Sequence, residues 1–192
     1  ATCDEDIYNL VNNNGGHAVM TSKNHKRCTD RIAEAAKFID ADIIVNVQGD
    51  EPLLNPNMFE PLVDPLLMDN DLECVNLMAL ASDIDYNNEG VVKVTVDNNF
   101  NALYFSREPI PSQSHSSSIK VDKYKQLGII AFRRDFLIEF SELKPTPLEV
   151  TESVDMLRVL EYGYRIKMVL TSFNSIGVDT KKDLLKFYIQ VR

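Results

Sequence analysis

Apolar positions in the first part of the chain switch regularly between two spacings. Three segments carry apolar residues three and four positions apart, which predicts helices over residues 4–13, 29–38 and 57–68. Short apolar runs come before and between these segments, which predicts strands over residues 1–2, 18–20 and 43–48. This alternation of strand and helix predicts a mostly parallel sheet covered by helices.

Strands dominate from Cys74 onward. Short β-type runs predict strands over residues 74–81, 91–97, 102–106, 127–132 and 166–170. Asn98 and Asn99 predict a hairpin turn, and the Ser-rich run at 112–118 predicts a polar loop.

The C-terminal part adds two predicted helices. The first covers 151–162, with Thr146 or Thr151 as its cap, and the second covers 180–190. Neither an internal repeat nor a long linker divides the chain. Residues 1–192 are therefore predicted to form a single domain.

Composition narrows the class of protein. The 192 residues are 44% hydrophobic and 26% charged, with a formal net charge of −9, which is ordinary for a globular chain. No apolar run approaches the ~20 residues of a membrane span. An acidic chain also lacks the clustered Lys and Arg of a broad nucleic-acid surface, so we expect neither a membrane nor a nucleic acid as partner. Cys3, Cys28 and Cys74 are too scattered for a disulfide framework, which favours a reducing cytoplasm.

Two adjacent carboxylates follow the strand predicted at 43–48. This run has no alternating polarity, which predicts a central strand covered on both faces, and ligands of open α/β sheets bind beyond the carboxyl ends of such strands. Gly49 allows close backbone approach, and Asp50 offers oxygen to a hard cation that clamps phosphates. An ordinary surface turn is an equal alternative, because Gly, Asp and Pro all favour turns.

Asp179 is a second acidic residue at a strand-to-helix turn. It follows a short apolar segment and precedes Thr180, a plausible cap of the last helix. By itself it reads more simply as a carboxylate stabilised by the helix dipole. Together with Asp50 it suggests one metal held from two sides.

Six segments of the chain occur in an order and spacing typical of one family. They are "MTSKNHKRCTDRIAE", "IVNVQGDEPLL", "ALYFSREPIP", "LGIIAFR", "TPLEVTESVDMLRVLEYGYRI" and "IGVDTKKDL". From its first residue nearly to its last, the chain resembles the 3-deoxy-manno-octulosonate cytidylyltransferases, the CMP-Kdo synthetases of lipopolysaccharide biosynthesis.

This resemblance implies a fold and a reaction. The fold is nucleotide-diphospho-sugar-transferase-like (Rossmann-like) α/β: a mixed sheet flanked by helices, with a smaller β-rich part for dimerisation. The enzymes are Mg²⁺-dependent homodimers. They couple CTP to an acidic 2-keto sugar and release pyrophosphate.

The resemblance also assigns residues to three groups by motif. The catalytic and Mg²⁺-binding pair is Asp50 and Asp179. The nucleotide-binding residues are Gln48, Gly49, Thr29 and Arg31. The sugar-binding residues are Arg107, Gln126 and Glu152.

Simpler roles remain open for three of the basic residues. Arg31 is favoured slightly as a partner of Asp30 or Glu34 on the helix surface. Lys93 either lines a strand face or is solvated. Arg107 has the fork geometry to pair with a carboxylate, whereas an arginine after a strand commonly lies on the surface.

Departures from the family pattern fall in two places. Arg27 and Cys28 stand where the family has small Ser and Gly, and a large cation there either clashes with a nucleotide or turns outward. On the sugar side, Gln126 replaces His, Met156 replaces Gln, and Ser112-Gln113 replaces an aromatic–polar pair. Loss of a titratable His removes repulsion against an ammonium, so we hypothesise that the sugar is the 8-amino analogue of Kdo.

The start of the chain resembles the end of the family's second strand. An N-terminal strand and a phosphate-binding loop are therefore expected to be missing. Without them we expect an unpaired sheet edge and no activity from these residues alone. Two alternatives remain: a cytidylyltransferase for another nonulosonic acid, or an inactive homologue acting as a binding subunit.

Overall fold

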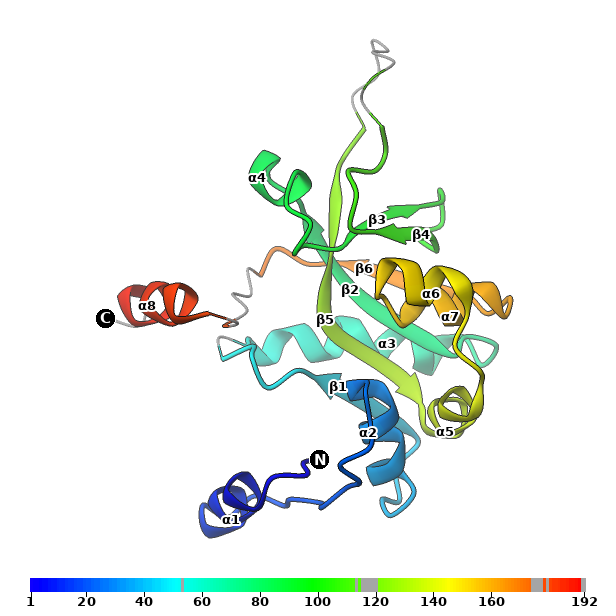
Figure 1. The fold of residues 1–192 in the computed structure, drawn as a ribbon. Helices are drawn as coiled ribbons and strands as arrows, with labels where there is room; N and C mark the ends of the chain where they lie inside the picture. Colours follow the sequence, from blue (N-terminus) through cyan, green and yellow to red (C-terminus); the bar gives the residue numbers. More distant parts are fainter. Residues whose placement is uncertain (53, 113, 115–120, 174–177, 179, 191–192) are drawn as a thin grey trace.

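The computed structural model describes residues 1–192 apart from 53, 113, 115–120, 174–177, 179 and 191–192. Six strands form one mixed sheet with helices on both faces (Figure 1). The helices are α1 (Glu5–Asn13), α2 (Cys28–Ala36), η1 (Pro56–Met58), α3 (Phe59–Met68), α4 (Asp83–Tyr86), α5 (Arg134–Glu142), α6 (Pro147–Glu152), α7 (Met156–Glu161) and α8 (Lys181–Gln190). The strands are β1 (Ile43–Val47), β2 (Cys74–Leu80), β3 (Lys93–Val96), β4 (Ala102–Ser106), β5 (Tyr124–Arg133) and β6 (Ile166–Leu170).

The prediction of a mostly parallel sheet is wrong. The strand order is β4-β3-β5-β2-β6, with β1 also paired to β5, and among the described pairings of these six strands only β2–β6 is parallel. Of the strands predicted at 1–2 and 18–20, the described residues show one isolated parallel bridge, between Thr2 and Met20. The strand–helix alternation does set β1, β2 and β6 in one direction. However, β5 enters between β1 and β2 in the opposite direction, so both become its antiparallel neighbours.

β1 is less central than predicted. Within the described part of the chain it pairs with β5 alone, and Asn46 is its one fully buried residue. The apolar composition of the strand therefore does not give its place in the sheet.

The core lies on the two faces of β2 and β5. Successive β5 residues alternate between the faces, as the two-residue repeat of a strand requires. Phe132 packs with α2, α5 and α7, whereas Ala131 packs with α3 on the other face. These helices cover both faces of the sheet next to the loops that follow its strands.

β5 changes partner at a bulge. Asn76 pairs with Ile130, but Met78 pairs with Gln126, so the three residues 127–129 of β5 oppose a single residue of β2. The Asn76 side chain donates to the carbonyl oxygens of Leu127 (2.8 Å) and Ile129 (3.0 Å), which satisfies groups that the bulge removes from the ladder. On its other edge, β5 pairs with β3 before the bulge and with β1 after it.

The single helix predicted over 151–162 is two helices. α6 ends before Ser153, whose φ of 54° is left-handed, and α7 begins at Met156. Thr146 is the N-cap residue of α6, which confirms one of the two proposed caps, and its backbone N–H donates to the Glu149 carboxylate at 3.2 Å. Thr151 instead donates to the carbonyl oxygen of Pro147 inside the helix.

The predicted hairpin turn is confirmed. β3 and β4 are antiparallel, and the Asp97 backbone N–H donates to the carbonyl oxygen of Asn101 at 2.9 Å. The Asp97 carboxylate accepts the N–H groups of Asn99 and Asn101, each at 2.8 Å, and so tightens the turn.

Candidate active site

The end of β1 meets the bulge of β5. Gln48 follows β1 and lies over Gly128: a Cβ at Gly128 would come 3.0 Å from the Gln48 side-chain carbon. A larger residue at 128 would therefore require the Gln48 side chain to shift. The next residue, Gly49, has nothing within 4 Å of the position of a Cβ, so its surroundings are open.

Asp50 carries an unusual carboxylate. Its Oδ1 is buried and has no hydrogen-bond partner among the described residues. A buried carboxylate oxygen without a partner is costly in a protein unless a cation or another donor satisfies it. This donor fits a hard divalent cation, which binds oxygen ligands.

The chain segment that leads to residue 179 is attached to Asp50. The backbone N–H of Val178 donates to the Asp50 carbonyl oxygen at 2.8 Å. Asp179 itself lies outside the described residues. Within the described part of the chain, no group of three or more His, Cys, Asp or Glu residues is arranged to hold a metal.

Thr29 and Arg31 start α2 and contact other parts of the protein. Thr29 Oγ1 donates to the carboxylate of Asp155, in the break between α6 and α7. Arg31 donates to Thr21 Oγ1 (2.7 Å) and to the Ser22 carbonyl oxygen (3.2 Å). Arg31 thus connects α2 to residues 21–22, which precede it in the chain.

The alternative partners of Arg31 are engaged elsewhere. Within 4 Å, Glu34 forms an ion pair with His25, and Asp30 forms one with Arg158 at 3.8 Å. Burial raises the pKa of the Asp30 carboxyl, and Arg158 opposes that rise. Among the ion pairs within 4 Å in the described part of the chain, Arg31 pairs with neither Asp30 nor Glu34. The pairing that the sequence favoured is therefore not found there.

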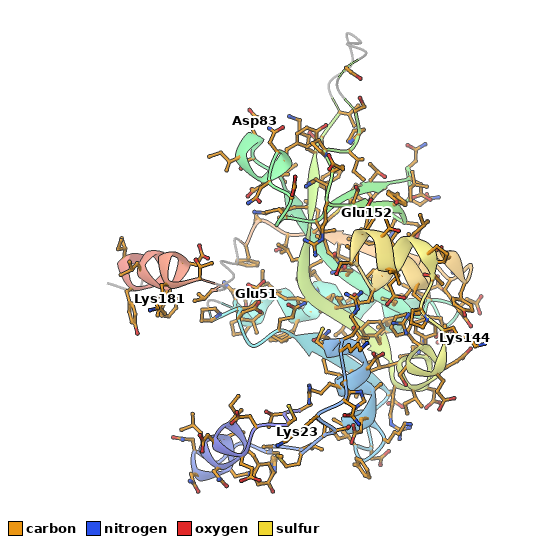
Figure 2. All side chains as sticks on the ribbon, in the orientation of Figure 1. Lys23, Glu51, Asp83, Lys144, Glu152 and Lys181 are labelled. Carbon is orange, nitrogen blue, oxygen red and sulfur yellow. The ribbon has the colours of Figure 1, made fainter. Side chains whose placement is uncertain are left out.

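Arg107 and Glu152 are brought together from distant segments. The Glu152 carboxylate accepts the Arg107 backbone N–H (2.9 Å), the Ser106 hydroxyl (2.8 Å) and the Tyr104 hydroxyl (3.3 Å). The guanidinium of Arg107 donates to the carbonyl oxygens of Glu152 (2.8 Å), Glu89 (3.0 Å) and Ser153 (3.3 Å). Arg107 thus organises the end of α6, and both it and Glu152 remain partly exposed. Figure 2 labels Glu152 beside α6.

Lys93, on β3, stabilises the backbone of Arg107. It is fully buried, and its ammonium donates to the carbonyl oxygens of Asn88 (2.9 Å), Val91 (2.7 Å) and Arg107. Burial lowers the pKa of Lys93, and Glu108 opposes that change. The prediction of a strand-face lysine is confirmed over that of a solvated one.

Gln126 lies just before the bulge. Its Nε2 donates to Asn76 Oδ1 at 2.7 Å, while Asn76 bridges the bulge carbonyls. The amide of Gln126 is therefore fixed by the same network that places Gly128 beneath Gln48.

The sequence analysis missed a buried ion pair behind the site. Glu149 and Arg158 are bidentate, at 2.7 Å (Nε to Oε2) and 2.6 Å (NH2 to Oε1), and both are almost fully buried. The sequence signal was weak: a base within the helix predicted over 151–162 and an acid nine positions before it, outside that helix. This pair connects α6 to α7 across the break.

Two hollows lie beside these residues. One, of about 420 Å³, lies between α2 and α5 and is lined by His25, Asp30, Glu34, Lys37, Ser141 and Glu142. The other, of about 520 Å³, lies along β3 and the start of β5, and Val94, Phe100, Pro111, Val121 and Tyr124 contribute to its wall.

The comparisons with known proteins agree with this geometry. Residues 1–167 match the cytidylyltransferase family, and the chain belongs to that family. Within it, the chain is 45% identical to the 3-deoxy-manno-octulosonate cytidylyltransferase of Geobacter metallireducens, over 97% of this chain and 77% of the relative. It is also 45% identical to the enzyme of the same name from Fusobacterium nucleatum, over 96% of this chain and 75% of the relative. The resemblance deduced from the sequence motifs is confirmed.

Solved structures give the same family and fold. A CMP:2-keto-3-deoxy-manno-octonic acid synthetase complexed with CTP superimposes with a TM-score of 0.91 at 34% identity, over 98% of this chain and 77% of that chain. A putative glucose-1-phosphate thymidylyltransferase from Bacillus anthracis shares the fold alone, with a TM-score of 0.64 and 14% identity over 98% of this chain and 72% of that chain. These likenesses confirm the predicted nucleotide-diphospho-sugar-transferase-like fold.

Proposed function

We propose that this protein transfers the CMP group of CTP to an acidic 2-keto sugar, 3-deoxy-manno-octulosonate (Kdo) or its 8-amino analogue, for lipopolysaccharide biosynthesis. The observation that carries this proposal is 45% identity to enzymes of that name over 97% of the chain. The TM-score of 0.91 to a synthetase complexed with CTP supports it. In the reaction, the anomeric hydroxyl oxygen bonds to the α-phosphorus, the bond to the bridging oxygen breaks, and pyrophosphate leaves while the hydroxyl proton is released.

The residues near the end of β1 are proposed for the nucleotide. Gln48 and Gly49 lie at the open end of the strand, where a nucleotide is able to approach the backbone. Thr29 and Arg31, in the first turn of α2, are the other two residues proposed to bind the nucleotide, and their side-chain contacts fix the start of that helix. Together they would orient CTP beside the sugar.

Asp50 and Asp179 are proposed to hold Mg²⁺. The unpartnered Oδ1 of Asp50 and the hydrogen bond from Val178, next to Asp179, support this pair. Mg²⁺ bound there would neutralise phosphate charge during the transfer.

Arg107, Glu152 and Gln126 are proposed for the acidic sugar. Gln126 uses Nε2 on Asn76, which leaves its amide oxygen as an acceptor. An acceptor suits an ammonium donor, so this residue supports a preference for the 8-amino analogue of Kdo. Side-by-side kinetics on the two sugars decide this point, and a clear preference for Kdo would refute it.

We also propose a homodimer that assembles through the β3–β4 part of the sheet. Phe100, Leu103 and Val121 are 41%, 60% and 60% exposed there, and a hollow of about 520 Å³ lies beside them. Sedimentation of the full-length protein tests this assembly, and a Leu103→Glu variant that remains a dimer would contradict the proposed interface.

We propose the cytoplasm as the location, since Cys3, Cys28 and Cys74 are all free thiols, as a reducing compartment favours. None of the helices among the described residues is long and apolar enough to cross a membrane.

The experiment that tests the function is pyrophosphate release by the full-length protein with CTP, Mg²⁺ and one keto-sugar acid at a time. Kdo, its 8-amino analogue and a nonulosonic acid form the panel. Release with one of the octulosonates and mass detection of its CMP ester support the proposal. Release only with the nonulosonic acid favours a cytidylyltransferase for that class of sugar. Release with none of the three favours an inactive homologue that acts as a binding subunit.

A further inference from the structure

Arg27 precedes α2 in the segment proposed to approach the nucleotide, and its side chain turns toward α6. Its NH1 donates to Ser153 Oγ at 3.3 Å, and its Nε lies 4.0 Å from the buried carboxylate of Glu149. The Arg27 side chain is 30% exposed and its bond to Ser153 lies at the surface, whereas the Glu149 carboxylate that it approaches is 1% exposed.

Ser153 is held from its other side by Arg107. The Ser153 carbonyl oxygen accepts from Arg107 NH2 at 3.3 Å, and the preceding carbonyl, of Glu152, accepts from Nε at 2.8 Å. Ser153 itself has the left-handed φ of 54°, a conformation that costs a non-Gly residue energy. Two arginines therefore donate hydrogen bonds to one strained residue: Arg27 to the Ser153 side chain and Arg107 to the Ser153 backbone. We call these three residues the Ser153 clamp.

Further polar contacts continue in register from the clamp. Thr29 Oγ1 donates to Asp155, and Asp30 lies 3.8 Å from Arg158. Three residues around the start of α2 thus contact the region of the α6–α7 break: Arg27 and Thr29 reach Ser153 and Asp155 in the break, and Asp30 lies near Arg158 inside α7. These polar contacts require defined geometry and so add to the apolar packing that α2 and α7 share in one core cluster.

We propose that Arg27 is a positioning residue that sets the distance between the nucleotide segment and the sugar-side residues Arg107 and Glu152, acting through Ser153. This inference rests on the proposed function. Transfer requires the attacking oxygen to lie about 3–3.5 Å from its target, so small errors in this spacing are costly. Loss of the clamp should affect the sugar site and leave CTP binding nearly unchanged.

Four variants of the full-length protein test the clamp. Arg27→Met keeps the side-chain stem but removes the donors, Arg27→Lys keeps the charge, and Ser153→Ala removes Oγ without changing the demand on φ. The fourth is the double variant. Lys26→Met, at the exposed neighbouring position, is the matched control.

We expect Arg27→Met to raise the KM for the keto sugar about tenfold, the low end for a hydrogen bond from a charged donor. The KM for CTP should change less than about twofold, and Arg27→Lys should restore part of the loss. The double variant should be no worse than Arg27→Met, because residues that act through one contact are not additive. A rise confined to the KM for CTP would overturn the proposal and make Arg27 a direct nucleotide ligand. Additive losses in the double variant would also overturn it, because they would show that Arg27 does not act through Ser153.

Amide hydrogen exchange of the substrate-free protein provides a readout that is independent of turnover. Arg27→Met should speed exchange in residues 152–155 and leave the β2–β5 core protected. Unchanged exchange there would overturn the clamp. If the wild-type protein makes no product from any keto sugar, the proposed function fails, whereas the exchange result still decides the clamp.

Discussion

Arg107 and Glu152 are joined by two hydrogen bonds of different kinds. The Arg107 backbone N–H donates to the Glu152 carboxylate at 2.9 Å, and the Arg107 guanidinium donates to the Glu152 backbone carbonyl at 2.8 Å. Each residue thus fixes the backbone of the other. A loop after β4 and the last turn of α6, far apart in sequence, are held as one unit.

Replacing Glu152 by Gln should loosen that unit. The carboxylate accepts three donors, whereas an amide presents an NH₂ group to at least one of them. We expect the free energy of unfolding to fall by about 1–2 kcal/mol and the KM for the keto sugar to rise at least fivefold. Urea unfolding and steady-state kinetics measure these changes, with Glu60→Gln on the exposed face of α3 as the control. An unaltered sugar KM would remove Glu152 from the sugar site.

Asp50→Asn should separate catalysis from folding. The buried Oδ1 has no hydrogen-bond partner among the described residues, so the neutral amide should leave stability unchanged or slightly raised. Turnover should fall by about 10²-fold or more, since charge neutralisation is a large part of phosphoryl-type transfer. Product formation across a Mg²⁺ titration and Mn²⁺ binding followed by electron paramagnetic resonance check this prediction.

The matched control for Asp50 is Asp40→Asn, at an exposed position outside the site. It should retain wild-type turnover and Mn²⁺ binding. Mn²⁺ binding by Asp50→Asn with wild-type affinity would contradict the assignment of Asp50 as a ligand.

The buried pair of Glu149 and Arg158 should behave as a unit. Arg158→Met strands a carboxylate that is 1% exposed, and we expect it to cost about 3–5 kcal/mol of unfolding free energy. Adding Glu149→Leu removes the stranded charge, so the double variant should recover much of that loss. Equilibrium urea unfolding of the two single variants and the double variant gives the coupling energy. Additive losses would show that the pair acts as two separate packing residues.

Stability in acid should report the contact between Glu34 and His25. The hydrogen bond from His25, followed by the Ser22 N–H, lowers the pKa of the Glu34 carboxyl below its ordinary value. A carboxyl with a lowered folded-state pKa contributes stability above its unfolded pKa of about 4.3, and this contribution is lost as the pH falls through the lower folded value.

Urea unfolding of the wild-type protein and Glu34→Gln between about pH 5 and pH 2 measures this effect. The wild-type advantage should shrink as the pH falls across that range. An advantage that stays constant would assign it to packing rather than to ionisation.

The sequence predicted local structure better than pairing. Residues 43–48 and 74–81 were correctly predicted as strands, and Gly49 and Asp50 were correctly placed at a strand end. Apolar periodicity carries no information on which strands become neighbours, so the antiparallel entry of β5 between β1 and β2 was missed.

The break at Ser153 shows a second limit. Ser is not a strong helix breaker, and the segment around it has helical spacing. The left-handed turn is stabilised by Arg107 and Arg27, which lie 46 and 126 positions away in the chain. The Glu149–Arg158 pair was missed because local patterns do not show which charges become buried.

The site residues divide in the same way. The sequence motifs placed Arg107 and Glu152 in one site, and the structure brings them into contact. Motifs did not indicate that the Arg107 guanidinium would bond backbone carbonyls of Glu152 and Ser153. The pairing of Asp50 with Asp179 stays a prediction, because Asp179 lies outside the described residues.

The most direct test of the account is the product made by the full-length protein from CTP and either 3-deoxy-manno-octulosonate or its 8-amino analogue. With Mg²⁺, the account predicts one pyrophosphate released for each CMP-octulosonate detected by mass spectrometry, and almost none from Asp50→Asn. Pyrophosphate release that is independent of the sugar, or the absence of any CMP ester from the wild-type protein, would contradict it.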